Sequence, residues 1–206
     1  MVIAKFTKKD IEFDKDEVLS NLFRLQDLWV PRSNNYPFFT LGRSAYLDGK
    51  TPEYKQKQLG MNTVLYNNFK ELYENVLHVL QEELQEDVYL PDDLCYPGFH
   101  IFKSHEKLLH TGGQWHSDQP HEILELGDKD ASTFTLAILI PKSGAGMDCM
   151  IDNMPIHIGY KEKEMIWHDG KTLHRIASIK EYVPDEFRIT LQGHLIRRDN
   201  HMEVFW

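Results

Sequence analysis

This chain of 206 residues contains little cysteine and lacks several other features, and each absence excludes a class of protein. The two cysteines, Cys95 and Cys149, are too few for a disulfide framework and form no C-x-x-C pair, so we expect reduced thiols. No run of about 18 apolar residues is present, which argues against a transmembrane helix. The opening residues, MVIAKFTKKDIEF, lack the apolar stretch of a secretory signal peptide. Together these absences predict a cytosolic protein.

The chain also has fewer basic than acidic residues. It contains 23 Lys and Arg and 32 Asp and Glu, which gives a formal net charge of −9. The basic residues are scattered along the chain, so nucleic acid and anionic membranes are poor partners for it. The composition, with 41% hydrophobic and 27% charged residues, is typical of a folded globular protein. We therefore expect one domain spanning residues 1–206.

The first ninety residues, about 1–90, favour helices. Apolar residues recur every three or four positions over 15–29 and again over 62–86, and each pattern predicts a helix with one apolar face. The segment between them is rich in Gly and Pro and predicts a structured loop, with a short extended piece at 38–41. These helices should form a layer on a neighbouring apolar surface.

From about residue 91 to 206 the hydrophobic period changes from 3.6 to 2, which predicts β-strands. We expect strands at 98–103, 122–126, 133–140, 148–151, 154–160, 164–168, 173–178 and 187–197. Short strands without a long helix between them favour a double-sheet jelly roll, so the fold class is mainly β with an N-terminal helical layer. A closed eight-stranded barrel carrying a lipid or pigment is the alternative.

Histidine is abundant, with eleven residues, and this favours a metal site in the second half of the chain. In the segment TGGQWHSDQPH, His116 and Asp118 are two residues apart, so an extended strand points both side chains to one face. His174 follows on a later predicted strand that a jelly roll can bring alongside. Two imidazoles and one carboxylate form a set that suits Fe(II) and leaves coordination positions open, whereas zinc would prefer a tetrahedral site.

The strand FRITLQGH places Arg188 and Thr190 on one face, fourteen and sixteen residues after His174. A buried guanidinium needs an anionic partner, and its planar shape fits a carboxylate. The Thr190 hydroxyl is a candidate second donor. This strand therefore predicts a carboxylate-binding site next to the candidate metal ligands.

The order H-x-D, then H, then R-x-T on short strands resembles the iron(II)/2-oxoglutarate-dependent dioxygenases, over about residues 98 to 197. The resemblance implies a double-stranded β-helix core in which His116, Asp118 and His174 hold iron. It also implies that Arg188 and Thr190 bind the distal carboxylate of 2-oxoglutarate, and that O2 and a small molecule are the other substrates. Halogenating members lack the carboxylate ligand, so Asp118 favours hydroxylation of an unactivated C–H bond.

Three more residues are candidate contacts with the substrate. Arg43 lies in the loop LGRSAYLDG, which is similar to the branch acting on free amino acids, and its guanidinium could anchor a substrate carboxylate. Gln114 shares the face of His116, and Trp115 precedes it. Three further histidines flank the predicted ligands and are alternative candidates for their role: His110, His121 and His168.

Two other classes of protein fit the same residues. A cupin-like metalloenzyme, either an isomerase or a dioxygenase that uses no oxo acid, would keep the metal and give Arg188 a structural role. A non-catalytic jelly-roll binding module would use the histidines to line a cleft without metal. The identity of the substrate and the oligomeric state are open at this stage.

Overall fold

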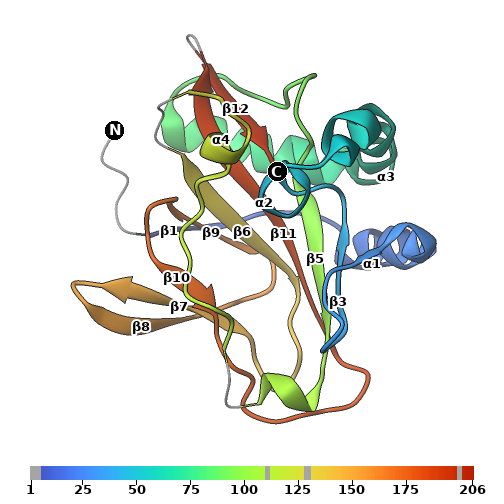
Figure 1. The fold of residues 1–206 in the computed structure, drawn as a ribbon, viewed down its shortest axis with the longest axis vertical. Coiled ribbons are helices and arrows are strands. Elements are labelled where there is room, and N and C mark those ends of the chain that lie inside the picture. Colours follow the sequence, from blue (N-terminus) through green and yellow to red (C-terminus); the bar gives the residue numbers. More distant parts are fainter. Residues whose placement is uncertain (1–5, 110–111, 128–130, 199–200) are drawn as a thin grey trace.

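A large sheet organises the fold in the computed structural model, which describes residues 6–109, 112–127, 131–198 and 201–206 (Figure 1). Its nine described strands are β1 (Thr7–Asp10), β2 (Val30–Pro31), β3 (Phe38–Leu41), β4 (Val88–Tyr89), β5 (Gly98–Lys103), β6 (Ser132–Leu139), β9 (Glu164–Asp169), β11 (Phe187–Arg198) and β12 (His201–Phe205). The strand order is β1-β9-β6-β11-β5-β3-β2, and β12 lies between β11 and β4. The long strand β11 is central, because it pairs with β5, β6 and β12.

A second sheet of three strands, β10 (His174–Ile176), β7 (Gly146–Ile151) and β8 (Met154–Gly159), faces the large one. Figure 1 shows it on the side of the large sheet away from the helices α1 (Lys15–Arg24) and α3 (Pro52–Leu84). Met147 and Cys149 of this sheet pack on Ile166 of β9. Two facing, mainly antiparallel sheets with a helical layer confirm the predicted jelly-roll class.

The local sequence explains where the two long helices begin. Asp14 caps α1, since its carboxylate accepts hydrogen bonds from the backbone N–H groups of Asp16 and Glu17. Pro52 opens α3, where its missing N–H costs nothing. The described helices include none with the length and apolar character needed to cross a membrane.

The two faces of the large sheet differ in character. Residues that alternate along β6 and β11, such as Phe134, Leu136 and Leu191, join the core beneath α1 and α3. The intervening residues face the small sheet and are mainly polar; in β6, β9 and β11 they include Thr133, Thr135, His168, Arg188, Thr190, Gln192 and His194. Strand alternation therefore places the residues of the hydrophobic core on one face of the sheet and the polar residues on the other.

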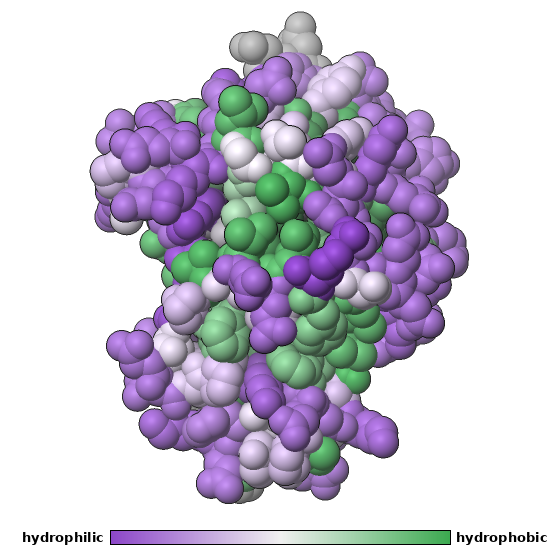
Figure 2. All heavy atoms as spheres, turned by 90° about the vertical axis from the view of Figure 1, so that its right-hand side faces the viewer, coloured by the Kyte–Doolittle hydropathy of each residue, from purple (hydrophilic) through white to green (hydrophobic). Residues whose placement is uncertain are grey.

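Figure 2 shows the side covered by the helices, where hydrophilic residues surround a band of apolar ones. Phe23 at the end of α1 is 38% exposed and packs edge-on against Phe187, with ring centroids 5.4 Å apart. Trp29 follows the 3-10 helix η1 (Gln26–Leu28) and lies 5.5 Å from the ring of Phe23. These aromatic rings close one edge of the core.

Three sequence predictions for local structure were wrong. The strand expected at 122–126 is replaced by the short helix α4 (Pro120–Ile123). The helix expected at 15–29 ends at Arg24, and the helix expected from 62 begins ten residues earlier, at Pro52. A proline at the first helical position was interpreted as a loop residue, although the first turn tolerates it well.

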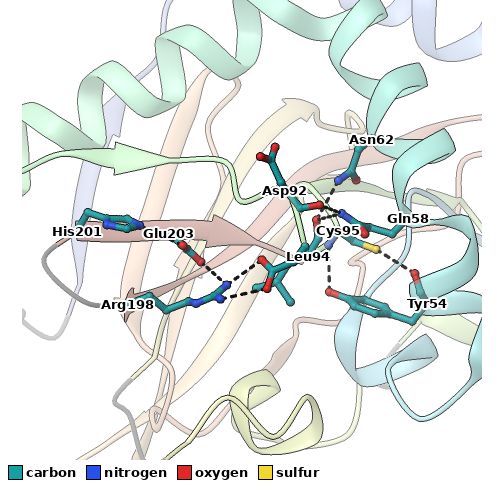
Figure 3. A network of polar contacts seen from close by, with 10 residues as sticks. Tyr54, Gln58, Asn62, Asp92, Leu94, Cys95, Arg198, His201 and Glu203 are labelled. Carbon is teal, nitrogen blue, oxygen red and sulfur yellow. Dashed lines mark hydrogen bonds and ion pairs between the residues drawn. The ribbon is translucent and has the colours of Figure 1, made fainter.

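Side chains of α3 fasten the chain segment that leads into β5 (Figure 3). Gln58 and Asn62 both donate to the carbonyl of Leu94, and Tyr54 Oη accepts from the N–H of Cys95 at 3.3 Å. Tyr54 Oη also donates to the carbonyl of Trp206 at 2.8 Å. The last residue of the chain is thereby held beside the sheet.

Trp206 lies so close to β5 that Gly98 has no room for a side chain. A Cβ atom at Gly98 would lie 2.0 Å from Cζ3 of Trp206 and 2.8 Å from the carbonyl oxygen of Leu41. We expect Gly98→Ala to lower the free energy of unfolding by about 1–3 kcal/mol, as overpacked cores do, measured by urea denaturation. The matched control is Gly60→Ala within α3, where nothing lies within 4 Å and the helix should gain roughly 0.5–1 kcal/mol. An unchanged midpoint for Gly98→Ala would contradict this account.

Candidate metal centre

His116 and His174 lie side by side on neighbouring chain segments. Their backbones form an isolated antiparallel bridge, with N–H to carbonyl distances of 2.9 and 2.8 Å. The N–H of Asp118 continues this pairing by donating to the carbonyl of Gly170. The segment through His116 thus runs beside β10 although it forms no regular strand, and the two-residue spacing turns His116 and Asp118 to the same side.

One ligand atom from each of His116, Asp118 and His174 lies within 4.8 Å of the others. Asp118 Oδ2 is 3.4 Å from His174 Nε2, and Oδ1 is 3.9 Å from His116 Nε2. Both imidazoles place Nδ1 within 2.9 Å of a backbone carbonyl, that of Gln114 for His116 and that of Thr172 for His174. Because a carbonyl only accepts, Nδ1 carries the hydrogen and Nε2 keeps the lone pair that a metal needs.

Asp118 is a buried carboxylate that pairs with no Lys or Arg among the described residues. Burial by itself raises its pKa, but the imidazoles of His194, His174 and His116 outweigh this effect, so the pKa of Asp118 lies below its usual value. Oδ2 is enclosed and accepts no hydrogen bond. Burial outweighs the attraction of Asp118 and lowers the pKa of His174. One carboxylate and two imidazoles are a donor set that fits a divalent transition metal.

An inner cavity of about 140 Å³ extends from these residues into the interior. His116 and His174 line it, together with Arg188 and Thr190 of β11. The structure therefore brings five residues singled out in the sequence, the three candidate ligands with Arg188 and Thr190, to one site. This site lies between the two sheets, on the polar face of the large one.

Arg188 is partly buried, and part of its side chain lines the cavity. Its guanidinium carbon is 4.9 Å from the ring centre of Phe102 and 5.3 Å from that of Tyr160. No carboxylate of the described residues pairs with Arg188, and its Nε is enclosed without a hydrogen-bond partner. Burial lowers the pKa of Arg188, which shows the cost of holding this charge away from water. Such a site favours an anion that arrives from outside.

Three further residues of this cavity were missed from the sequence: His100, Tyr46 and Gln192. His100 pairs with Thr190 across β5 and β11, and burial together with the charge of Arg188 lowers its pKa to about 3, so the ring is neutral. Tyr46 Oη lies 3.4 Å from Gln192 Oε1. Strand alternation in GFHIFK and FRITLQGH could have identified His100 and Gln192, because each shares a face with a cavity residue.

An outer cleft of about 870 Å³ opens at the same place. Phe38, Tyr46 and His116 line both the inner cavity and this cleft, so the candidate metal ligands lie where the two spaces meet. The predicted substrate residues Gln114 and Trp115 line the cleft as well. Trp115 also stacks on Arg175, whose guanidinium carbon is 4.6 Å from its ring centre.

Arg43, the predicted anchor for a substrate carboxylate, lines neither space. Its guanidinium is 3.5 Å from Asp48 Oδ1. The same carboxylate forms a shorter, bidentate ion pair with Arg32, with distances of 2.8 and 2.6 Å. Burial raises the pKa of Asp48, and the hydrogen bonds from Arg32 more than reverse this, leaving a net lowered pKa. Arg32 lines the outer cleft, so the structure brings this arginine, and not Arg43, toward the candidate metal ligands.

The alternative histidines occupy different positions. The ring of His168 is 4.8 Å from that of His174, but His168 does not belong to the group whose ligand atoms converge. His121 is buried in α4, with Nδ1 unpartnered. His110 lies outside the described residues. The geometry of the described chain thus favours His116, Asp118 and His174 as one set.

No protein-family model matches the chain, and no curated protein matches its sequence. Solved structures do match. An N-substituted L-amino acid dioxygenase from Burkholderia ambifaria AMMD aligns over 98% of this chain and 87% of its own, with a TM-score of 0.63 and 13% identity. Its complex with alpha-KG covers the same shares, with a TM-score of 0.61 and 12% identity.

A non-heme alpha ketoglutarate dependent epimerase from nogalamycin biosynthesis, SnoN, aligns over 94% of this chain and 81% of its own, with a TM-score of 0.53 and 12% identity. Sequence identities this low establish a common fold and leave the chemistry to be argued from the residues. The chain accordingly has the fold of these enzymes.

Proposed function

We propose that this chain is an iron(II)- and 2-oxoglutarate-dependent oxygenase that hydroxylates a C–H bond of a small molecule. The observation that carries the proposal is Arg188, which pairs with no described carboxylate and keeps an enclosed, unpartnered Nε, in the same cavity as His116 and His174. A metal site alone would fit many enzymes. The added cation in the cavity favours a ligand that has a carboxylate for Arg188 and a separate metal-chelating group.

Each side chain has a definite task in this proposal. The imidazole Nε2 atoms of His116 and His174 and the Asp118 carboxylate would hold iron beside the cavity and the cleft. Arg188, with the Thr190 hydroxyl, binds the distal carboxylate of 2-oxoglutarate. Bound iron supplies the dioxygen chemistry that amino-acid side chains lack, with conversion of 2-oxoglutarate and O2 to succinate and CO2.

The outer cleft holds the substrate next to the iron. Tyr36 and Phe38 stack on Phe102 and provide an apolar wall. The ring centroids of Phe38 and Phe102 are 4.1 Å apart. His116 lies in the same cleft, so a substrate seated there would present a C–H bond to the metal. A free amino acid is a candidate substrate, because the solved structures that share this fold include an N-substituted L-amino acid dioxygenase.

An absorption titration tests the proposal. Adding Fe(II) and 2-oxoglutarate to the protein without oxygen is expected to produce a weak visible charge-transfer band, because the oxo acid chelates the iron. Succinate, which lacks the 2-oxo group, is the control and should give no band. A folded protein that binds iron but gives no band with the oxo acid would favour the cupin-like metalloenzyme. Failure to take up any metal would favour the binding module.

A further inference from the structure

The fold holds the three candidate metal ligands to different degrees. The side chains of Asp118 and His174 are 2% and 6% exposed, whereas that of His116 is 44% exposed. His174 begins the strand β10, but His116 belongs to no regular strand and pairs with His174 through an isolated bridge. The position of His116 therefore depends most on contacts that its neighbours make.

The segment 112–119, which carries His116, is fastened to other parts of the chain at separate points. The described backbone hydrogen bonds that it donates to other segments come from the N–H groups of Gly113, His116 and Asp118. Trp115 lies between two of these points, directly before His116. A contact that fixes Trp115 therefore also restricts where His116 can lie.

Arg175 makes that contact. It follows His174 on β10, and its guanidinium carbon lies 4.6 Å from the ring centre of Trp115. A guanidinium within about 6 Å of an aromatic ring is attracted by the ring electrons, and Trp is the best partner for it. The stack thus joins the residue before one imidazole ligand to the residue after the other.

Asp148 holds the guanidinium in turn. Arg175 pairs in register with Asp148 of β7, and its Nε donates to Asp148 Oδ2 at 3.1 Å. Asp148 also pairs in register with His157 of β8, whose Nδ1 lies 3.0 Å from Asp148 Oδ1. Side chains directly opposite one another across a sheet stabilise each other in this way. The small sheet therefore presents Arg175 to Trp115 with its Nε already engaged.

We propose that Arg175 and Trp115 position His116 for metal binding, with Asp148 as the anchor of Arg175. The stack keeps the segment of His116 against β10, so that its imidazole stays beside the Asp118 carboxylate. Residues around a metal ligand fix its orientation and thereby the affinity of the site. The inference rests on the proposed metal site and adds positioning residues that contribute no ligand atom.

Amide hydrogen exchange in metal-free protein is the first test, because it depends on the stack alone. The N–H of His116 donates to the carbonyl of His174, so it exchanges when this bridge opens. We expect Arg175→Met to speed this exchange by roughly 3- to 10-fold, which corresponds to the loss of one cation–π contact. The amides of β11 should keep their rates. An unchanged rate for the His116 amide would overturn the proposal.

Co(II) affinity, measured by calorimetry, is the second test. Arg175→Met and Trp115→Leu should each weaken binding by roughly 3- to 10-fold. Together they should weaken it no more than either alone, because both remove the same contact. Arg175→Lys keeps a cation and should recover part of the affinity, which a purely structural role would not predict. The control is Arg24→Met on α1, on the other side of the large sheet.

Three results would count against this role. Parent-like Co(II) affinity in folded Arg175→Met, or losses that simply add in the double variant, would refute the positioning of His116 by the stack. A parent protein that binds no Co(II) would overturn the proposed metal site, while the exchange test would still decide whether the stack holds His116.

Discussion

Replacing Arg188 by methionine is expected to raise the 2-oxoglutarate concentration needed for half-saturation by roughly 30-fold or more. The reason is that a carboxylate bound in a buried cavity loses its charged partner, at a cost of about 2–5 kcal/mol. Iron affinity should change little, because Arg188 contributes no ligand atom. Titration of the visible band with 2-oxoglutarate at saturating Fe(II) measures the effect directly.

The folded state should tolerate this substitution well. Methionine can occupy the space between Phe102 and Tyr160, and the change removes a buried charge that no described carboxylate balances. The matched control is Arg197→Met on the same strand, since Arg197 is half exposed and pairs with Glu86, a contact worth little. An unchanged 2-oxoglutarate requirement, or a loss of iron affinity without it, would show that Arg188 has another role.

Asp118→Asn is expected to abolish hydroxylation and to weaken Fe(II) binding by about 100-fold or more, beyond what the loss of an outer partner costs. The amide keeps the size of the side chain but removes the negative charge, so only two neutral imidazoles remain as strong ligands. Calorimetry with Fe(II) under anaerobic conditions gives the affinity. Succinate release with the substrate gives the activity.

A control aspartate separates loss of the ligand from a general loss of charge. Asp93 is 60% exposed at its side chain, pairs with Arg198 and lines neither the cavity nor the cleft, so Asp93→Asn should leave iron affinity unchanged. Both variants should melt as single folded species. Parent-like iron affinity in Asp118→Asn would mean that the metal is held elsewhere.

The convergence of His116, Asp118 and His174 could be anticipated because strand alternation and residue order are local properties of the sequence. Alternation fixes which side chains share a face, and it placed Arg188 and Thr190 together on β11. The same rule failed at 122–126, where the first two residues end the helix α4 that begins at Pro120 and the next two form a turn. A pattern this short is compatible with either structure, and proline at the first helical position decided it.

The rest of the candidate site depends on contacts between distant segments. Arg32 and Arg43 lie in the same region of the sequence, and only the fold of their loop determines that Arg32 faces the cleft. Short edge strands such as β1 and β4 are defined by their partners, β9 and β12, more than by their own residues. Loop conformation and long-range pairing leave no periodic trace in a single sequence.

The two faces of β11 differ in character, so substitutions that affect stability and substitutions that affect ligand binding fall at different positions of the strand. Successive residues of the strand have different roles, because one packs in the hydrophobic core and the next lines the cavity. New ligand preferences could therefore arise through every second residue while the hydrophobic interior stays as it is. A scaffold built this way is free to diversify without first becoming more stable.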